Sequence, residues 1–107
     1  MKEIEIKYKL PDLKQSERYN VNNDRENERM QGIYALFVGD TLVYIGKSVN
    51  VRQRVRQHKY DTCRESPFTS FTFVGFEHIT KGELLFYETI YIDYYKPSWN
   101  QQKAYRR

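Results

Sequence analysis

Hydrophobic and polar residues in the middle of the chain alternate with the two-residue period of β-strands. The stretches 32–39 (GIYALFVG) and 41–48 (TLVYIGKS) are therefore predicted to be strands, and the Gly-Asp pair between them is typical of a tight hairpin turn. In the second strand, strict alternation predicts two faces, one with Val43 and Ile45 and the other with Leu42 and Tyr44.

After this hairpin the pattern indicates two helices and a third strand. Ser48 or Asn50 can cap a helix that runs from residue 51 to about residue 60. The stretch 68–78 is rich in aromatic and β-branched residues and is predicted to be a strand. A second helix is expected over 83–95, shortly before a proline that prevents its continuation. This order of elements predicts an α+β domain with a mostly antiparallel sheet.

The first third of the chain has a different pattern. Residues 3–10 alternate apolar and charged side chains, which predicts a half-buried strand that Pro11 ends. Residues 14–30 are polar and lack periodicity, and we interpret them as a loop that could hold a short helix. The sequence is accordingly divided into an N-terminal extension, residues 1–31, and one domain, residues 32–107.

The composition is that of a soluble domain, with 39% hydrophobic and 30% charged residues. No apolar run approaches the ~18 residues that a membrane-spanning helix needs, and the N-terminus lacks the apolar core of a signal peptide. The single cysteine, Cys63, excludes an intramolecular disulfide and favours a reducing compartment. We therefore expect a cytoplasmic protein that makes no membrane contact.

Basic residues are concentrated in one part of the chain. The net charge is +4, yet residues 1–31 carry seven basic and seven acidic residues. Residues 45–60 carry no acid and five basic residues, which are Lys47, Arg52, Arg54, Arg56 and Lys59. Such a stripe can follow a phosphate backbone, although a solvated helix face has the same composition. The charge distribution favours a nucleic-acid partner without establishing it.

One carboxylate occupies an unexpected position in the predicted second helix. At 100° per residue, Glu88 falls in the middle of the apolar stripe formed by Leu84, Leu85, Tyr91 and Ile92. A buried carboxylate must pair, become protonated or bind a cation. Two interpretations remain open: a Glu satisfied by a neighbouring Arg or Tyr, or a carboxylate in a cleft that holds a divalent metal.

Arg54 and His58 are one turn apart on the predicted first helix and share a face. Such a pair is usually solvated surface. If a carboxylate such as Glu88 lies nearby, an arginine on this face is suited to clamp a phosphate group.

Several short motifs now form a recognisable set. The strings GIY at 32–34 and YIG at 44–46 lie on the predicted hairpin, Arg54 lies eight residues beyond the second string, and the stretch YETIYIDYYKPSWN contains Glu88 and Asn100. Together they resemble the signature of the GIY-YIG nuclease superfamily. The resemblance covers about two thirds of the chain, from residue 32 to about residue 101.

This resemblance implies a fold and an activity. The fold is a small three-stranded, mostly antiparallel sheet flanked by helices, and the activity is divalent-metal-dependent hydrolysis of DNA phosphodiester bonds by an endonuclease. Glu88 would bind Mg²⁺ or Mn²⁺, and Arg54 would hold the scissile phosphate. Tyr34 or Tyr44 would be the general base, with Tyr34 preferred, and nearby cations would have to lower the pKa of that tyrosine.

The resemblance assigns the other residues more auxiliary roles. His58 would accept a proton or contact the phosphate, and Asn100 would anchor the chain near the site. Contacts to the DNA backbone that do not depend on its sequence would come from Lys47, Arg52, Arg56 and Lys59.

Two alternatives to the nuclease remain open at this point. The same fold could be a non-catalytic module that binds nucleic acid, or an interaction domain whose N-terminal strand pairs with a partner. If the protein cuts both DNA strands with one active site per chain, it needs a homodimer, and the strand expected at residues 3–10 could supply the interface.

Overall fold

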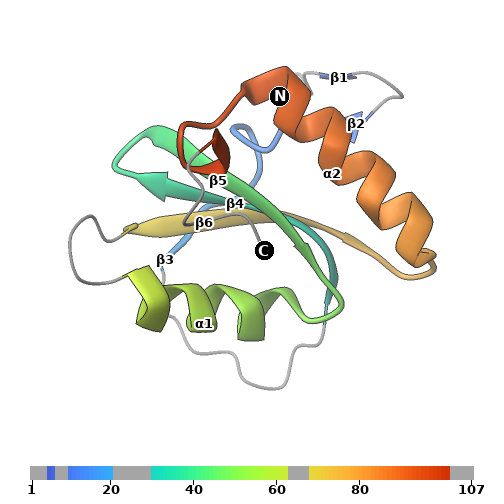
Figure 1. The fold of residues 1–107 in the computed structure, drawn as a ribbon, viewed down its shortest axis with the longest axis horizontal. Coiled ribbons are helices and arrows are strands. Elements are labelled where there is room, and N and C mark those ends of the chain that lie inside the picture. The colour runs from blue at the N-terminus through green and yellow to red at the C-terminus, as the bar shows by residue number, and fades with distance from the viewer. Residues whose placement is uncertain (1–4, 7–9, 21–29, 63–67, 102–107) are drawn as a thin grey trace.

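The structure is a computed structural model that describes residues 5–6, 10–20, 30–62 and 68–101. Its centre is an antiparallel sheet of three long strands (Figure 1), in which β4 lies between β5 and β6. This arrangement confirms the predicted α+β class. The strands of this sheet are β4 (Gln31–Val38), β5 (Thr41–Ser48), β6 (Ser70–Phe76) and the two-residue edge strand β3 (Tyr19–Asn20), which pairs with β6.

The β4–β5 hairpin has the predicted two-residue turn, in which Gly39 adopts a φ of 60°. The predicted faces of β5 are wrong at its first residues. Leu42 pairs with Phe37 and Tyr44 pairs with Leu36, so Val43 has no partner on β4 and is an extra residue. This β-bulge moves Val43 to the same face as Tyr44, while Leu42 lies on the face of Ile45. Strict alternation cannot predict a bulge of this kind.

The two long helices lie close to their predicted positions. Helix α1 (Val51–Thr62) is capped by Asn50, whose side chain accepts a hydrogen bond from the backbone N–H of Gln53 at 3.3 Å. Helix α2 (Lys81–Tyr95) begins two residues earlier than expected. Its start is set by a capping box in which Thr80 and Glu83 each accept the other's backbone N–H. Of the two described helices, neither is long and apolar enough to cross a membrane.

Helices α1 and α2 cover opposite faces of the sheet (Figure 1), so the domain has two cores. On the α1 face, Val51 and Val55 pack on the strands together with Trp99 from the short 3₁₀ helix η2 (Trp99–Gln101). On the α2 face, the core is formed by Leu84 and Tyr91 with inward residues of β4 and β5. Functional groups on the two helices can therefore meet only around an edge of the sheet.

The N-terminal region is more ordered than its composition suggests. The prediction of one strand over 3–10 that Pro11 ends is wrong, because β1 (Glu5–Ile6) pairs antiparallel with β2 (Leu10–Pro11). Residues 3–4 and 7–9 of that prediction lie outside the described residues. Strand β3 lies within 14–30, where a loop or short helix was expected, so that prediction is wrong at Tyr19. Residues 14–18 lack helix and strand, as expected of a loop, and residues 21–29 lie outside the described residues.

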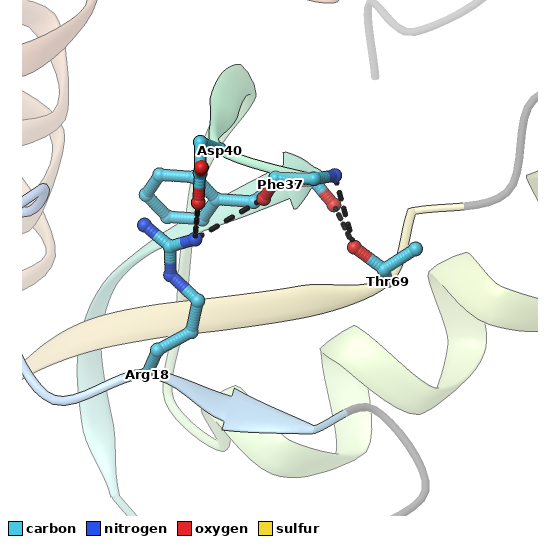
Figure 2. A network of polar contacts seen from close by, with 5 residues as sticks. Arg18, Phe37, Asp40 and Thr69 are labelled. Atoms are coloured by element: carbon cyan, nitrogen blue, oxygen red, sulfur yellow. Dashed lines mark hydrogen bonds and ion pairs between the residues drawn. The ribbon is translucent and has the colours of Figure 1, made fainter.

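Two threonines on β6 and just before it differ in how their hydroxyls are satisfied. The hydroxyl of Thr69 donates to the carbonyl of Phe37 at 3.3 Å and accepts from the N–H of Gly39 at 3.1 Å (Figure 2). Thr72 is fully buried, and its hydroxyl has no hydrogen-bond partner among the residues that the structure describes. A buried hydroxyl without a partner costs stability.

We therefore expect Thr72→Val to stabilise the domain by about 1 kcal/mol, because valine has the same shape and removes the buried hydroxyl. Thr69→Val is the matched control and should lower stability, since it leaves the Gly39 N–H without its acceptor. Thermal unfolding of the three proteins measures both effects. A lower melting temperature for Thr72→Val would contradict this account of β6.

Candidate active site

Three rings meet on the α1 face of the hairpin. Tyr34 of β4 and Tyr44 of β5 lie on the same face, with ring centroids 6.2 Å apart. His58 of α1 packs against both rings, and its Nε2 lies 2.7 Å from the hydroxyl of Tyr34. All three side chains are buried. The hydroxyl of Tyr34 therefore has a basic nitrogen within hydrogen-bond distance.

Two glycines make this arrangement possible, in two different ways. A Cβ added to Gly46 would lie 2.4 Å from the Tyr34 hydroxyl, so the tyrosine side chain occupies the space that any larger residue would fill. A Cβ added to Gly32 would lie 2.0 Å from the carbonyl oxygen of Val74, so this glycine allows β4 and β6 to approach each other. Gly46 is opposite Tyr34 in the β4–β5 register. Because β5 is an edge strand, Tyr34 extends over it toward the edge of the sheet.

Arg54 and Glu88 act on Tyr34 from the two helices. Charge and a hydrogen bond from Arg54 on α1 lower the pKa of Tyr34, whereas Tyr44 and the carboxylate of Glu88 on α2 raise it. Burial has the largest effect, and the pKa of Tyr34 is raised well above its ordinary value. Arg54 lowers this pKa, as expected of a nearby cation, but its effect is smaller than that of burial. Tyr34 is a protonated phenol across the physiological pH range.

Glu88 lies at the border of the buried face of α2. Leu84 and Tyr91 are buried, but Leu85 is 52% exposed, so the apolar stripe is narrower than the sequence predicted. Glu88 itself is half-buried. Burial raises the pKa of Glu88, and the positive charge of Lys47 on β5 opposes that effect. The carboxylate is thus partly desolvated yet open to solvent, beside the edge strand that Tyr34 crosses.

Asn100 fixes the chain after α2 to this same edge. Its side chain accepts a hydrogen bond from the backbone N–H of Ile45 and donates one to the Ile45 carbonyl, both at 2.8 Å. The side-chain amide thereby pairs with the open edge of β5, as another strand would. Ile45 lies between Tyr44 and Gly46, so Asn100 holds the strand segment on which Tyr34 and Tyr44 pack.

A comparison with protein families explains why these residues occur together. The family model of the GIY-YIG catalytic domain matches residues 30–103 of the 107-residue chain. The chain belongs to the GIY-YIG family. Tyr34, Tyr44, Arg54, Glu88 and Asn100 all lie inside the matched region, which indicates a nuclease-type fold. No curated protein matches the chain significantly.

The basic residues expected to contact DNA fall into two groups in this GIY-YIG domain. Lys47 and Arg56 are exposed. Arg52 is only 7% exposed, because its guanidinium stacks on three aromatic rings, those of Tyr19, Phe71 and Phe73. The prediction that Arg52 is a surface contact to the DNA backbone is therefore wrong; it joins α1 to the sheet. The side chain of Lys59 lies outside the described residues.

The sequence did not predict that the positive charge of Lys47 acts on Glu88 and lowers its pKa. That relation depends on how α2 packs across β5, for which the local sequence contains no signal. The hydrogen bond between Tyr34 and His58 was also not predicted, although the position of His58 one turn after Arg54 placed both residues on the correct face of α1.

The donor set available to a metal ion in this domain is small. Within the described parts of the chain, no three side chains of the His, Cys, Asp and Glu types converge. Glu88 is a single oxygen ligand of the kind that Mg²⁺ and Mn²⁺ prefer, and it is open to solvent on one side. These properties fit an ion that is held by one carboxylate and completed by water and a phosphate oxygen.

Proposed function

We propose that this GIY-YIG domain is a divalent-metal-dependent DNA endonuclease that hydrolyses phosphodiester bonds. The observation that carries the proposal is the environment of one hydroxyl. Tyr34 is hydrogen-bonded to His58, and its pKa responds to Arg54 from one helix and to Glu88 from the other. A proton acceptor, an arginine suited to bind phosphate and a carboxylate suited to bind a metal ion are thus all within electrostatic reach of one hydroxyl.

The raised pKa of Tyr34 constrains how it acts. A phenol that stays protonated cannot accept a proton from water unless its own proton leaves in the same step. His58 supplies the acceptor, because its Nε2 is 2.7 Å away and accepts the phenolic hydrogen bond in the tautomer with its proton on Nδ1. We therefore assign Tyr34 as a proton relay: its oxygen takes the proton of the attacking water while His58 takes the phenolic proton.

Arg54 and Glu88 act on the phosphate. Arg54 is partly exposed, and it donates hydrogen bonds to Gln57 at 2.8 Å and to the hydroxyl of Tyr34. A guanidinium has five N–H donors, so others can bind the scissile phosphate. Glu88 would hold Mg²⁺ or Mn²⁺. When bound, that ion supplies positive charge to the phosphoryl oxygens and to the leaving 3′ oxygen. Because Glu88 is a single ligand, metal affinity without DNA should be low.

The surface near the site carries charges suited to DNA. Lys47 beside Glu88 and Arg56 on α1 are exposed and can contact backbone phosphates without regard to sequence. We assign Lys59 the same role from the sequence alone, because its side chain lies outside the described residues. The substrate is accordingly intracellular DNA, and cutting of both strands would bring two copies of the chain together. A non-catalytic module would not need a half-buried carboxylate and an arginine that both act on the Tyr34 hydroxyl, which is why we favour the enzyme.

The proposal is tested by incubating the protein with supercoiled plasmid in millimolar Mg²⁺, with a chelator in a parallel sample. We expect nicked or linear product only in the sample with free Mg²⁺. Retention of the same plasmid on the protein is measured at increasing salt, because phosphate contacts weaken as salt rises. Salt-sensitive retention with intact plasmid in Mg²⁺ and in Mn²⁺ would replace the endonuclease by the binding module.

A further inference from the structure

Residues 10–20 form a segment that we call the N-terminal strap. It lies outside the region that matches the GIY-YIG family, which begins at residue 30. The strap nevertheless belongs to the folded unit: Leu10 and Leu13 are buried in the core under α2. In Figure 1 the segment runs from beside α2 to β3, on the side of the sheet where α1 lies. The strap therefore contacts α2 near its start and α1 near its end, and these two helices carry the proposed active site.

The strap is fastened to α2 through two tyrosines. The hydroxyl of Tyr95 donates a short hydrogen bond to Asp12 and accepts one from the backbone N–H of Leu13 at 2.9 Å. The hydroxyl of Tyr91 donates to the carbonyl of Pro11 at 2.6 Å. Burial and the Asp12 carboxylate raise the pKa of Tyr95, so its proton remains available for Asp12. Asp12 itself is 8% exposed and also accepts the N–H of Lys14.

The far end of the strap is fastened to the sheet and to α1. The guanidinium of Arg18 stacks on Phe37 at 4.0 Å and bonds to Asp40 at 3.1 Å in the hairpin (Figure 2). The next residue, Tyr19, pairs with Phe71 of β6 and lies under the guanidinium of Arg52, 5.1 Å from ring centroid to Arg52 Cζ. Arg52 is two residues before Arg54 on α1.

The strap contacts α2, the helix that carries Glu88, and it contacts α1 two residues before Arg54. Tyr91 is one turn beyond Glu88 on α2, and Tyr95 is one turn further on the same side of the helix. We propose that the strap positions α2 against the edge of β5, and that Asp12 and Tyr95 are positioning residues for the Glu88 carboxylate. The catalytic unit then begins near residue 10, and not at the start of the family match. For its catalytic consequence, this inference rests on the endonuclease proposal.

A purely core-filling role for the strap would need only its leucines. Tyr95→Phe separates the two roles, because it keeps the ring, Leu10 and Leu13 and removes the hydroxyl that joins Asp12 and Leu13. Tyr94→Phe is the matched control: Tyr94 is the preceding residue of the same helix and is 53% exposed. All measurements are made on the full chain at a temperature well below the unfolding transition of every variant.

Two readouts test the inference, one independent of catalysis and one dependent on it. Hydrogen exchange should speed up in residues 84–92 of α2 in Tyr95→Phe and stay unchanged in Tyr94→Phe. The Mg²⁺ concentration for half-maximal plasmid nicking should rise about 10-fold in Tyr95→Phe, as expected when the support of a metal ligand is lost. Tyr94→Phe should match the unsubstituted protein in both.

The outcomes separate the two proposals. If the unsubstituted protein does not nick DNA, the endonuclease proposal fails, and hydrogen exchange alone still decides whether the strap positions α2. If it nicks DNA and Tyr95→Phe shows unchanged exchange in 84–92 and unchanged Mg²⁺ dependence, the strap has no positioning role. Faster exchange with a raised Mg²⁺ requirement supports the inference in full. Faster exchange with an unchanged Mg²⁺ requirement overturns the role of Asp12 and Tyr95 in positioning Glu88.

Discussion

Gly46→Ala should abolish most of the nicking activity and lower the stability of the domain. The added methyl group would lie 2.4 Å from the oxygen and 2.5 Å from the Cζ atom of Tyr34. Tyr34 is 1% exposed and packed against Tyr44 and His58, so it cannot withdraw without disturbing both. Overpacking of this kind costs about 1–3 kcal/mol. A displacement of about 1 Å at a reacting group reduces the rate about 100-fold.

Gly82→Ala is the matched control for this substitution. A Cβ at Gly82 meets only the hydroxyl of Thr80, at 3.9 Å, so there is room for it. Alanine in the first turn of α2 should stabilise the domain by about 0.4–1 kcal/mol and leave nicking unchanged. Thermal unfolding and initial nicking rates of the three proteins measure both effects. Full activity in Gly46→Ala would show that the position of the Tyr34 hydroxyl does not matter for the reaction.

Glu88→Gln should have opposite effects on activity and on stability. The substitution removes the proposed metal ligand, so nicking should be lost. It also replaces a half-buried carboxylate, whose pKa is raised because burial penalises its charge more than Lys47 compensates. At neutral pH the charged Glu88 therefore destabilises the folded state. We expect a higher melting temperature for Glu88→Gln than for the unsubstituted protein.

The stability difference between Glu88→Gln and the unsubstituted protein should depend on pH, because the pKa of Glu88 is raised in the folded state. A carboxyl group with a raised folded-state pKa favours folding below its ordinary value of 4.5, and that contribution is lost as the pH rises through the folded-state pKa. The advantage of Glu88→Gln should thus vanish below pH 4.5 and grow as the pH rises through the raised pKa of Glu88.

Glu83→Gln on the same helix is the control. Hydrogen bonds from Thr80 lower the pKa of Glu83, so its charge favours folding above the ordinary pKa, and this substitution should lower the melting temperature at neutral pH without affecting nicking. Equal melting temperatures of Glu88→Gln and the unsubstituted protein at neutral pH would show that burial of the Glu88 charge does not destabilise the folded state.

Local sequence patterns predicted most of the central fold. The alternation in β4, the Gly-Asp turn and the polar residues before α1 are all signals that depend on a few neighbouring residues. The edge strand at Tyr19 could not be predicted in this way, because it is set by pairing with β6, which is distant in sequence. The bulge at Val43 lies within the β4–β5 hairpin, but strict alternation contains no signal for it. The start of α2 could have been predicted, since Thr80 and Glu83 have the spacing of a capping box.

The candidate site was predicted in its membership but not in its electrostatics. Motif resemblance pointed to Tyr34, Arg54 and Glu88, and in the structure both Arg54 and Glu88 affect the pKa of Tyr34. It could not show that burial raises the pKa of Tyr34 or that Arg52 turns away from solvent. Both properties depend on the packing of α1 against the sheet, which no local pattern specifies.

The central claim is that Glu88 supports metal-dependent hydrolysis at the edge of β5. Its most direct test compares the initial rates of plasmid nicking by the unsubstituted protein and by Glu88→Gln in saturating Mg²⁺, with DNA retention measured on the same samples. We predict a rate at least about 100-fold lower for Glu88→Gln, with retention preserved. Equal nicking rates for the two proteins would contradict the claim.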